Sequence, residues 1–194
     1  MTENQLREQK QQLRAKRMML WFGIGSLVMG FAAFTSAYLV SSERDDWIND
    51  FALPTAFYYS TFVIVVSSVT MFLAFRAVKK EQNKQGMILL LLTFILGVVF
   101  GIMQFEGFRE ITQDFGYNFT GPTSSITYTY VYLIAVVHLA HIVAALIALM
   151  VVIYNHYKQK YAQGQTLGIE LAATFWHFVD LLWLYLFFFL YFFR

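Results

Sequence analysis

Residues 175–183 read Phe-Trp-His-Phe-Val-Asp-Leu-Leu-Trp and lie inside the apolar stretch 168–194 that closes the chain. A run this long and this apolar is typical of a membrane-spanning helix, in which ionisable side chains are expensive. At about 1.5 Å per residue from Gly168, His177 and Asp180 lie roughly 14 and 18 Å along it, near the middle of a hydrocarbon layer about 30 Å thick. They are three residues apart and share one helix face. We therefore expect that face to contact protein and not lipid.

The composition of the whole chain indicates an integral membrane protein. Of 194 residues, 58% are hydrophobic and only 13% are charged, a balance that a soluble domain of this size does not keep in solution. The chain has no cysteine, which excludes disulfides, thiolate metal sites and cysteine nucleophiles. It also lacks a nucleophile with an adjacent base, a phosphate-binding glycine loop and a nucleotide fingerprint. We expect neither an active site in this chain nor a nucleic-acid partner.

Five apolar segments are long enough to cross a membrane. They occupy residues 18–40, 54–75, 87–105, 128–154 and 168–193. The first is 23 residues long, against the 7 to 15 of a signal-peptide core, so we interpret it as an anchor that stays in place. Short loops make successive helices antiparallel neighbours. The sequence predicts an all-α protein, one five-helix membrane bundle over residues 1–194 with no second domain or repeat.

The distribution of Lys and Arg predicts the orientation of this bundle. The N-terminus has five of these residues, the loop after the second segment has four and the loop after the fourth has two, or eleven on one side. The other side has three: Arg44, Arg109 and Arg194. By the positive-inside rule the N-terminus is cytoplasmic, and an odd number of spans then places the C-terminus outside.

Small residues four apart predict close helix approaches in the lipid phase. The pairs are Ser26 with Gly30, Ala33 with Ala37, and Gly97 with Gly101.

Polar side chains at membrane depth are the candidate functional residues. They are Gln104 in the third segment, His138 and His141 in the fourth, His177 and Asp180 in the fifth, and Glu170 at its inner rim. The simplest interpretation is that they satisfy one another across the interface of the last two helices, through hydrogen bonds of about 0.6 to 2 kcal/mol each. A second is a bis-histidine haem site, with His138 or His141 opposite His177. A third is a proton or ion relay, although the chain lacks the paired halves of a transporter; roles in lipid headgroup binding also stay open.

Three stretches resemble subunit III of the haem-copper oxidases, the terminal enzymes of aerobic respiration. Gly168-Ile169-Glu170, followed by Trp176-His177-Phe178-Val179-Asp180 and Trp183, resembles the last helix of that family. Val137-His138-Leu139-Ala140-His141 resembles the paired histidines of its penultimate helix, and the Gly97, Phe100 and Gln104 pattern resembles the helix before it. The full family form has seven helices, and this chain resembles the last five, a known short form.

This resemblance implies a subunit without haem or copper, which other subunits of the oxidase would carry. It implies packing beside the catalytic subunit I, a place in a complex with subunit II and other respiratory-chain subunits, and bound phospholipid. It also implies support of proton uptake and protection against inactivation during turnover, in a bacterial cytoplasmic membrane. The polar and aromatic framework of the family would be Gln104, His138, His141, Glu170, Trp176, His177, Asp180 and Trp183.

Two departures from the family pattern bear on these expectations. Many relatives hold a buried glutamate in the helix that matches the first segment, whereas the position here is near Leu27 and the segment has no acid. Relatives also place a glutamate three residues after the glutamine, whereas Glu106 follows Gln104 by two and Gly107 comes next. The alternatives that stay open are a quinol oxidase subunit, a homologue associated with nitric oxide reductase and, in another class, a b-haem membrane redox protein.

Overall fold

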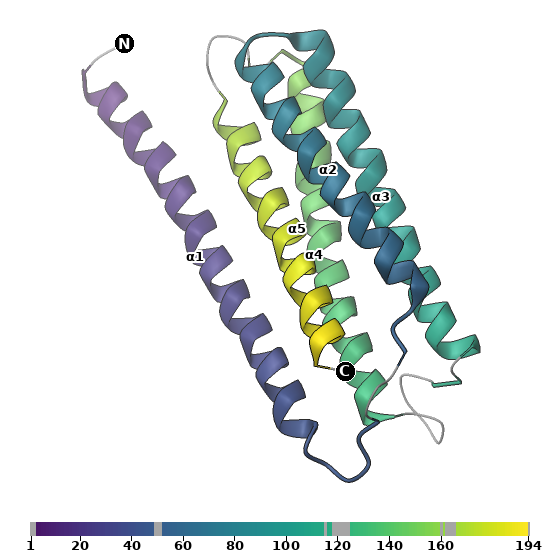
Figure 1. Cartoon of the computed structure of the whole chain (residues 1–194). Helices are drawn as coiled ribbons and strands as arrows, with labels where there is room; N and C mark the ends of the chain where they lie inside the picture. The colour runs from purple at the N-terminus through teal and green to yellow at the C-terminus, as the bar shows by residue number, and fades with distance from the viewer. Residues whose placement is uncertain are drawn as a thin grey trace.

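The protein is a bundle of five long helices in a computed structural model that describes residues 3–48, 52–114, 116–117, 125–159, 161 and 166–193. The helices are α1 (Glu3–Ser41), α2 (Thr55–Lys79), α3 (Asn83–Gln113), α4 (Ile126–Tyr157) and α5 (Leu167–Phe192). Each is long and apolar enough to cross a membrane. The predicted all-α, five-span fold is confirmed, and the two ends of the chain lie at opposite ends of the bundle (Figure 1).

Two helices extend beyond the apolar segments that predicted them. The polar lead-in before Met18 belongs to α1, which runs without a break from Glu3. The third helix ends at Gln113 and not near Phe105, because Glu106 to Gln113 continue the helical turn instead of starting a loop. Hydropathy marks where a helix enters the hydrocarbon layer, whereas the helix itself ends only where its backbone finds other partners.

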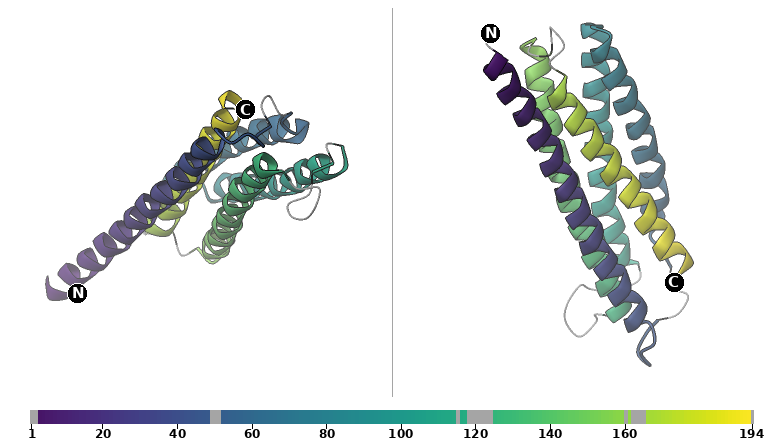
Figure 2. Two further views of the ribbon diagram at one scale, coloured as in Figure 1. Left: turned by 90° about the horizontal axis from the view of Figure 1, so that it is seen from below. Right: turned by 90° about the vertical axis from the view of Figure 1, so that its left-hand side faces the viewer.

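Helices α2 to α5 form one packed body, and α1 lies outside it. Each of α2, α3, α4 and α5 contacts its neighbour along the chain, and α5 returns to α2 to close the group. Helix α1 makes fewer contacts, and these go to α5 and α4. Figures 1 and 2 show α1 as a separate column along α5 and α4.

Two buried glycines of α3 are in close contact with aromatic rings from other helices. A Cβ atom added to Gly97 would lie 2.5 Å from Cη2 of Trp176, and one added to Gly107 would lie 2.4 Å from Cε1 of Phe57. Real Cβ atoms do not approach other atoms so closely, so both sites require a residue without a side chain. The predicted close approach at Gly97 is confirmed, while a Cβ atom at Gly101 would meet only Leu139, at an ordinary 3.9 Å.

The small residues of α1 do not mediate close packing with the rest of the described chain. Ser26, Gly30, Ala33 and Ala37 are all exposed, and nothing lies within 4 Å of a Cβ atom added to Gly30. The side chains of α1 that are buried instead are Ile24, Phe31, Thr35 and Tyr38. The prediction of close approaches by these two pairs is wrong inside this chain, because larger side chains bury more area against α4 and α5.

Candidate functional site

The central feature of the bundle is a row of hydroxyl groups on α2 that receives the polar rings of α5. The Trp176 indole donates to Ser67 Oγ at 3.2 Å, and the Trp183 indole donates to Thr61 Oγ1 at 3.0 Å. Between them, Ser68 Oγ and His177 Nδ1 share a hydrogen bond of 2.7 Å. These three bonds fix the register of α5 on α2, and we call them the α2/α5 polar ladder.

Helical geometry explains why the ladder forms. Trp176 and Trp183 are seven residues apart, close to two turns, so both rings leave α5 on the same side. Helix α2 runs antiparallel and presents Ser67 and Thr61 at the matching heights. Sequence reasoning singled out the rings of α5 but missed their partners. The available signal was the recurrence of Ser and Thr in an otherwise apolar span.

Helix α3 joins this polar layer from the other side of α2. Gln104 is fully buried and its Nε2 donates to Ser60 Oγ at 2.9 Å, whereas its Oε1 has no hydrogen-bond partner in the described part of the chain. The hydroxyls of Thr70 and Thr93 share a further bond of 2.9 Å. The polar groups of α2 therefore connect to α3 and to α5 at once.

The two candidate histidines of α4 do not join the ladder. His138 is fully buried among the rings of Phe31, Phe100 and Trp183, and neither of its nitrogens has a hydrogen-bond partner within the described residues. His141 Nδ1 donates to the carbonyl oxygen of Val137, one turn back on its own helix, at 2.7 Å.

The expected mutual hydrogen bonding between the polar groups of α4 and α5 is therefore wrong. The polar side of α5 turns to the hydroxyls of α2, which donate and accept at short range. The space between α4 and α5 is filled by aromatic rings such as Trp183, whose centroid lies 5.1 Å from that of His138.

Asp180 is the second buried polar group without a partner. It is 3% exposed, and neither carboxyl oxygen makes a hydrogen bond to any residue that the structure describes. Ser68 lies close enough to interact with it, yet the bond that Ser68 makes goes to His177. Ser68, His177 and Asp180 thus gather at one place between α2 and α5.

A fourth histidine, which sequence reasoning missed, holds the end of α4 to the start of α3. His156 is buried, its Nε2 donates to the carbonyl oxygen of Asn83 at 3.1 Å, and its ring stacks on Tyr161. Burial also raises the pKa of the Tyr161 hydroxyl above its usual value. The hydrogen bond to Asn83 joins the end of α4 to the start of α3, two segments that are distant in the sequence.

Glu170, predicted to lie at the inner rim, connects α5 to α1. Its Oε2 lies 2.9 Å from Nη2 of Arg17, and both side chains are exposed. Glu170 is in the first turn of α5, where a carboxylate also interacts favourably with the helix dipole.

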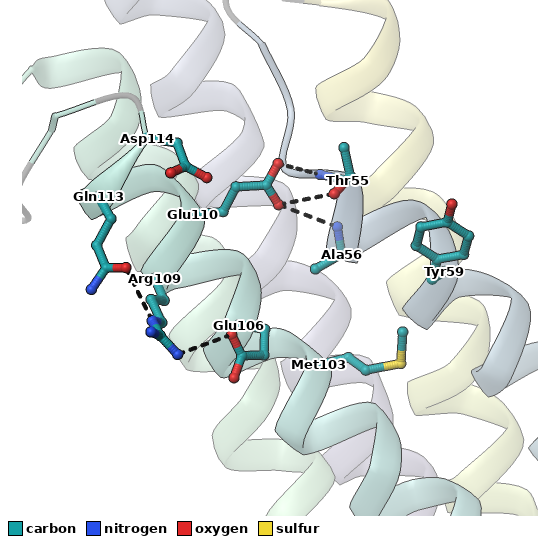
Figure 3. Close-up of a pocket in the computed structure, with 9 residues that line it drawn as sticks. All are labelled: Thr55, Ala56, Tyr59, Met103, Glu106, Arg109, Glu110, Gln113 and Asp114. Carbon is teal, nitrogen blue, oxygen red and sulfur yellow. Dashed lines mark hydrogen bonds and ion pairs between the residues drawn. The ribbon is translucent and has the colours of Figure 1, made fainter.

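At the opposite end of the bundle, Glu110 of α3 caps the first turn of α2 (Figure 3). Pro54 offers no side-chain cap, and Glu110 instead accepts hydrogen bonds from the backbone N–H groups of Thr55 and Ala56, at 2.9 and 3.4 Å. A cavity of about 450 Å³ opens beside it and is also lined by Glu106, Arg109 and Asp114. The extension of α3 beyond the predicted span thus serves to satisfy the start of α2.

The arrangement of the described His, Asp and Glu side chains does not favour binding of a metal ion or a haem. No group of three or more His, Asp or Glu side chains among the described residues could hold a metal. His138 is enclosed by aromatic rings, and His177 turns its Nδ1 to Ser68 of α2.

Comparisons with known proteins agree with this architecture. The family described as "Cytochrome c oxidase subunit III" matches residues 46–194, which contain α2 to α5. The chain belongs to this subunit III family. Because the match includes the whole packed body, the polar ladder lies inside the part of the chain that defines membership.

Relatives within the family bear names from two kinds of oxidase. Cytochrome c oxidase subunit 3 of Alkalihalophilus pseudofirmus is 26% identical over 171 residues, 86% of this chain and 81% of the relative. Cytochrome bo(3) ubiquinol oxidase subunit 3 of Buchnera aphidicola is 25% identical over 175 residues, 89% of this chain and 83% of the relative. A probable cytochrome c oxidase subunit 3 of Rickettsia bellii is 32% identical over 136 residues, 69% of this chain and 47% of the relative.

Family membership and the five spans together give the setting of the molecule. It is a subunit of a multi-subunit oxidase complex, and its bacterial relatives indicate a multi-pass protein of a bacterial cytoplasmic membrane.

Proposed function

We propose that this chain is a structural, non-redox subunit III of a proton-pumping haem-copper terminal oxidase, the complex that reduces oxygen to water. It packs on the catalytic subunit I, with subunit II and other respiratory-chain subunits in the same complex. One observation supports this above the others. Trp176, His177 and Trp183 of α5 form hydrogen bonds with hydroxyls of α2, so these three side chains hold the two helices together.

Bound phospholipid is part of the proposal. An apolar cavity of about 340 Å³ lies beside α1 and touches α4 and α5. Its lining is almost wholly apolar, and acyl chains fit such a groove where α1 stands apart from the packed body. The proposed support of proton uptake and of lifetime during turnover rests on the resemblance to the family.

Two measurements test the proposal: the identity of the proteins that co-purify with the chain, and the absorption spectrum of the chain alone. We expect a haem-copper subunit I to co-purify with the tagged chain in mild detergent, and we expect the chain purified alone to show no Soret band. A Soret band retained by the separate chain would favour the b-haem alternative and contradict the proposal. A haem spectrum of the co-purified complex supplies the positive control.

Two variants test the structural role inside the complex. Asp180→Asn and His177→Ala should weaken assembly or shorten the working lifetime, while the initial turnover per assembled complex stays nearly unchanged. Neither residue has a redox partner among the described groups, so chemistry elsewhere in the complex is not affected directly. A hundredfold fall in initial turnover of fully assembled enzyme would contradict this assignment.

The electron donor is cytochrome c or, in the second candidate, quinol. Relatives named for each donor match this chain at 26% and 25% identity. Substrate oxidation by the purified complex, measured with reduced cytochrome c and with a quinol in parallel, separates the two, and a nitric oxide reductase activity would identify the third alternative.

A further inference from the structure

His177 presents an unpartnered polar atom on the outside of the bundle at the depth of the hydrocarbon core. Its Nδ1 is bonded to Ser68 Oγ, whereas its Nε2 has no hydrogen-bond partner among the described residues. The residue is only half-buried, and unlike the nitrogens of His138 this Nε2 is not enclosed. His177 follows the start of α5 by ten residues, or about 15 Å. That is roughly the middle of a membrane.

A lipid environment cannot satisfy such an atom. Acyl chains offer neither donors nor acceptors, and phospholipid headgroups lie about 15 Å away at the membrane surface. Polar side chains in membrane helices accordingly face protein or a water-filled cavity. Asp180, three residues further along α5, adds a buried carboxyl group without a partner at the same place. The polar centre of Ser68, His177 and Asp180 is therefore incomplete within the described part of the chain.

Exposed apolar side chains flank this centre on both helices. On α2 it includes Val65 and Phe72, which are 42% and 43% exposed, and on α5 it includes Leu181 and Phe188, which are 66% and 51% exposed. Helical spacing places the two α2 residues on one side with Ser68, and the two α5 residues on one side with His177. We call these six residues the His177 face: Val65, Ser68, Phe72, His177, Leu181 and Phe188.

We propose that the His177 face is the docking surface for a transmembrane helix of another subunit of the oxidase, and that this helix places a hydrogen-bonding side chain against His177 Nε2. Membrane helices associate through side-chain packing and interhelical hydrogen bonds, and this face provides both packing side chains and an unpaired imidazole nitrogen. The partner side chain is a hydroxyl, amide or other group that can pair with imidazole. The inference rests on the proposed function in one respect, namely that the partner belongs to the same complex.

Photo-crosslinking tests which face meets the partner. The chain contains no cysteine, so a single introduced thiol can be labelled selectively with a benzophenone reagent. Leu181→Cys reports on the His177 face. Val143→Cys is the matched control, because Val143 is 49% exposed on α4 and lies fourteen residues from the end of its helix, as Leu181 does from the start of α5.

We expect the Leu181→Cys label, irradiated in native membranes, to give an adduct with a different oxidase subunit, and the Val143→Cys label to react with lipid. An adduct yield at Leu181→Cys no higher than at Val143→Cys would overturn the proposal. An adduct between two copies of this chain would overturn it as well, since the partner would then be wrong.

Replacement of His177 tests the polar contact itself. His177→Phe should reduce the amount of this chain that co-purifies with a tagged catalytic subunit at least tenfold, whereas His177→Asn, which keeps a hydrogen-bonding group, should retain most of it. Circular dichroism of the separate variants controls for folding. Equal recovery of His177→Phe and the unmodified chain would overturn the proposal. If the unmodified chain itself recovers no haem-copper subunit, the proposed function fails instead.

Discussion

Two of the interfaces of α5, with α2 and with α1, are built in different ways. Against α2, three hydrogen bonds from Trp176, His177 and Trp183 lie in the interior of the span. Against α1, the polar contacts are farther apart: Arg17 with Glu170 near the start of α5, Thr35 with Tyr185 two residues after Trp183, and Tyr38 with the carbonyl oxygen of Phe193 just beyond its end. An apolar cavity of about 360 Å³ separates α1 from α5 between these contacts.

The difference shows which part of the molecule is a fixed body and which part is attached to it. In the most apolar 18-residue stretch of each helix, 50% of the residues of α5 are buried, against 17% of those of α1. An interface with closely spaced hydrogen bonds and interlocking rings resists sliding, whereas one with an apolar cavity between its polar contacts can open at that cavity. We expect α2 to α5 to unfold as one unit and α1 to separate from it at lower cost.

The largest expected effect on stability comes from the contact between the Trp176 ring and Gly97 of α3. Gly97→Ala would place a Cβ atom 2.5 Å from the indole and 3.0 Å from Leu146, and the buried ring is held by its bond to Ser67. We expect a loss of about 1–3 kcal/mol in the free energy of unfolding. Gly101→Ala is the control, with 3.9 Å to its neighbour. Unfolding titrations with SDS in mixed micelles measure the stability of both variants. Equal unfolding midpoints for Gly97→Ala and Gly101→Ala would contradict a rigidly packed α2–α5 body.

A smaller effect is expected from the polar ladder. Thr61→Val and Trp183→Phe each remove one side of a 3.0 Å hydrogen bond while leaving most of the side-chain volume. A double-mutant cycle in detergent should give a coupling energy of about 0.6–1.7 kcal/mol. A coupling energy near zero would mean that ring packing alone sets the register of α5 on α2.

The attachment of α1 should be weaker still. Arg17→Gln removes an ion pair whose side chains are 54% and 38% exposed, so we expect at most about 1 kcal/mol, decreasing with added salt. Hydrogen exchange should show faster opening in α1 and no change in α5. Arg14→Gln, on the same exposed lead-in, is the control. Faster exchange throughout α5 would contradict the separation of the two regions.

The smallest effect lies in the loop that follows α1. The hydrogen bond from Arg44, at 2.8 Å, lowers the pKa of the Asp46 carboxyl. Any contribution of this bond to stability is therefore present above the usual pKa of an aspartate, and it is lost as the pH falls through the lowered pKa. Both side chains are more than half exposed, at 57% and 55%, and we expect no measurable change in unfolding. Carbon-13 NMR of the carboxyl should show the pKa of Asp46 rising in Arg44→Gln and unchanged in Glu43→Gln.

The contrast between the two interfaces also explains what sequence reasoning could not foresee. His177 and Asp180 were predicted to share a face that contacts protein, and both lie beside Ser68 of α2. Their expected partners on α4 were wrong, because depth in the membrane says nothing about the direction in which a helix is rotated. Ser and Thr in a span are also weak signals by themselves, since they can bond to their own backbone, as Thr61 does to Phe57.

The sequence by itself determined the number of spans, the membrane setting and the family, because hydropathy, charge distribution and the Trp-His-Phe-Val-Asp run are written along the chain. Only the tertiary structure decided that α2 is the partner of α5, that His138 is enclosed by aromatic rings and that α1 stands apart. The physical reason is that span formation depends on local composition. Pairing depends on the rotation and register of whole helices, which side chains distant in sequence select together.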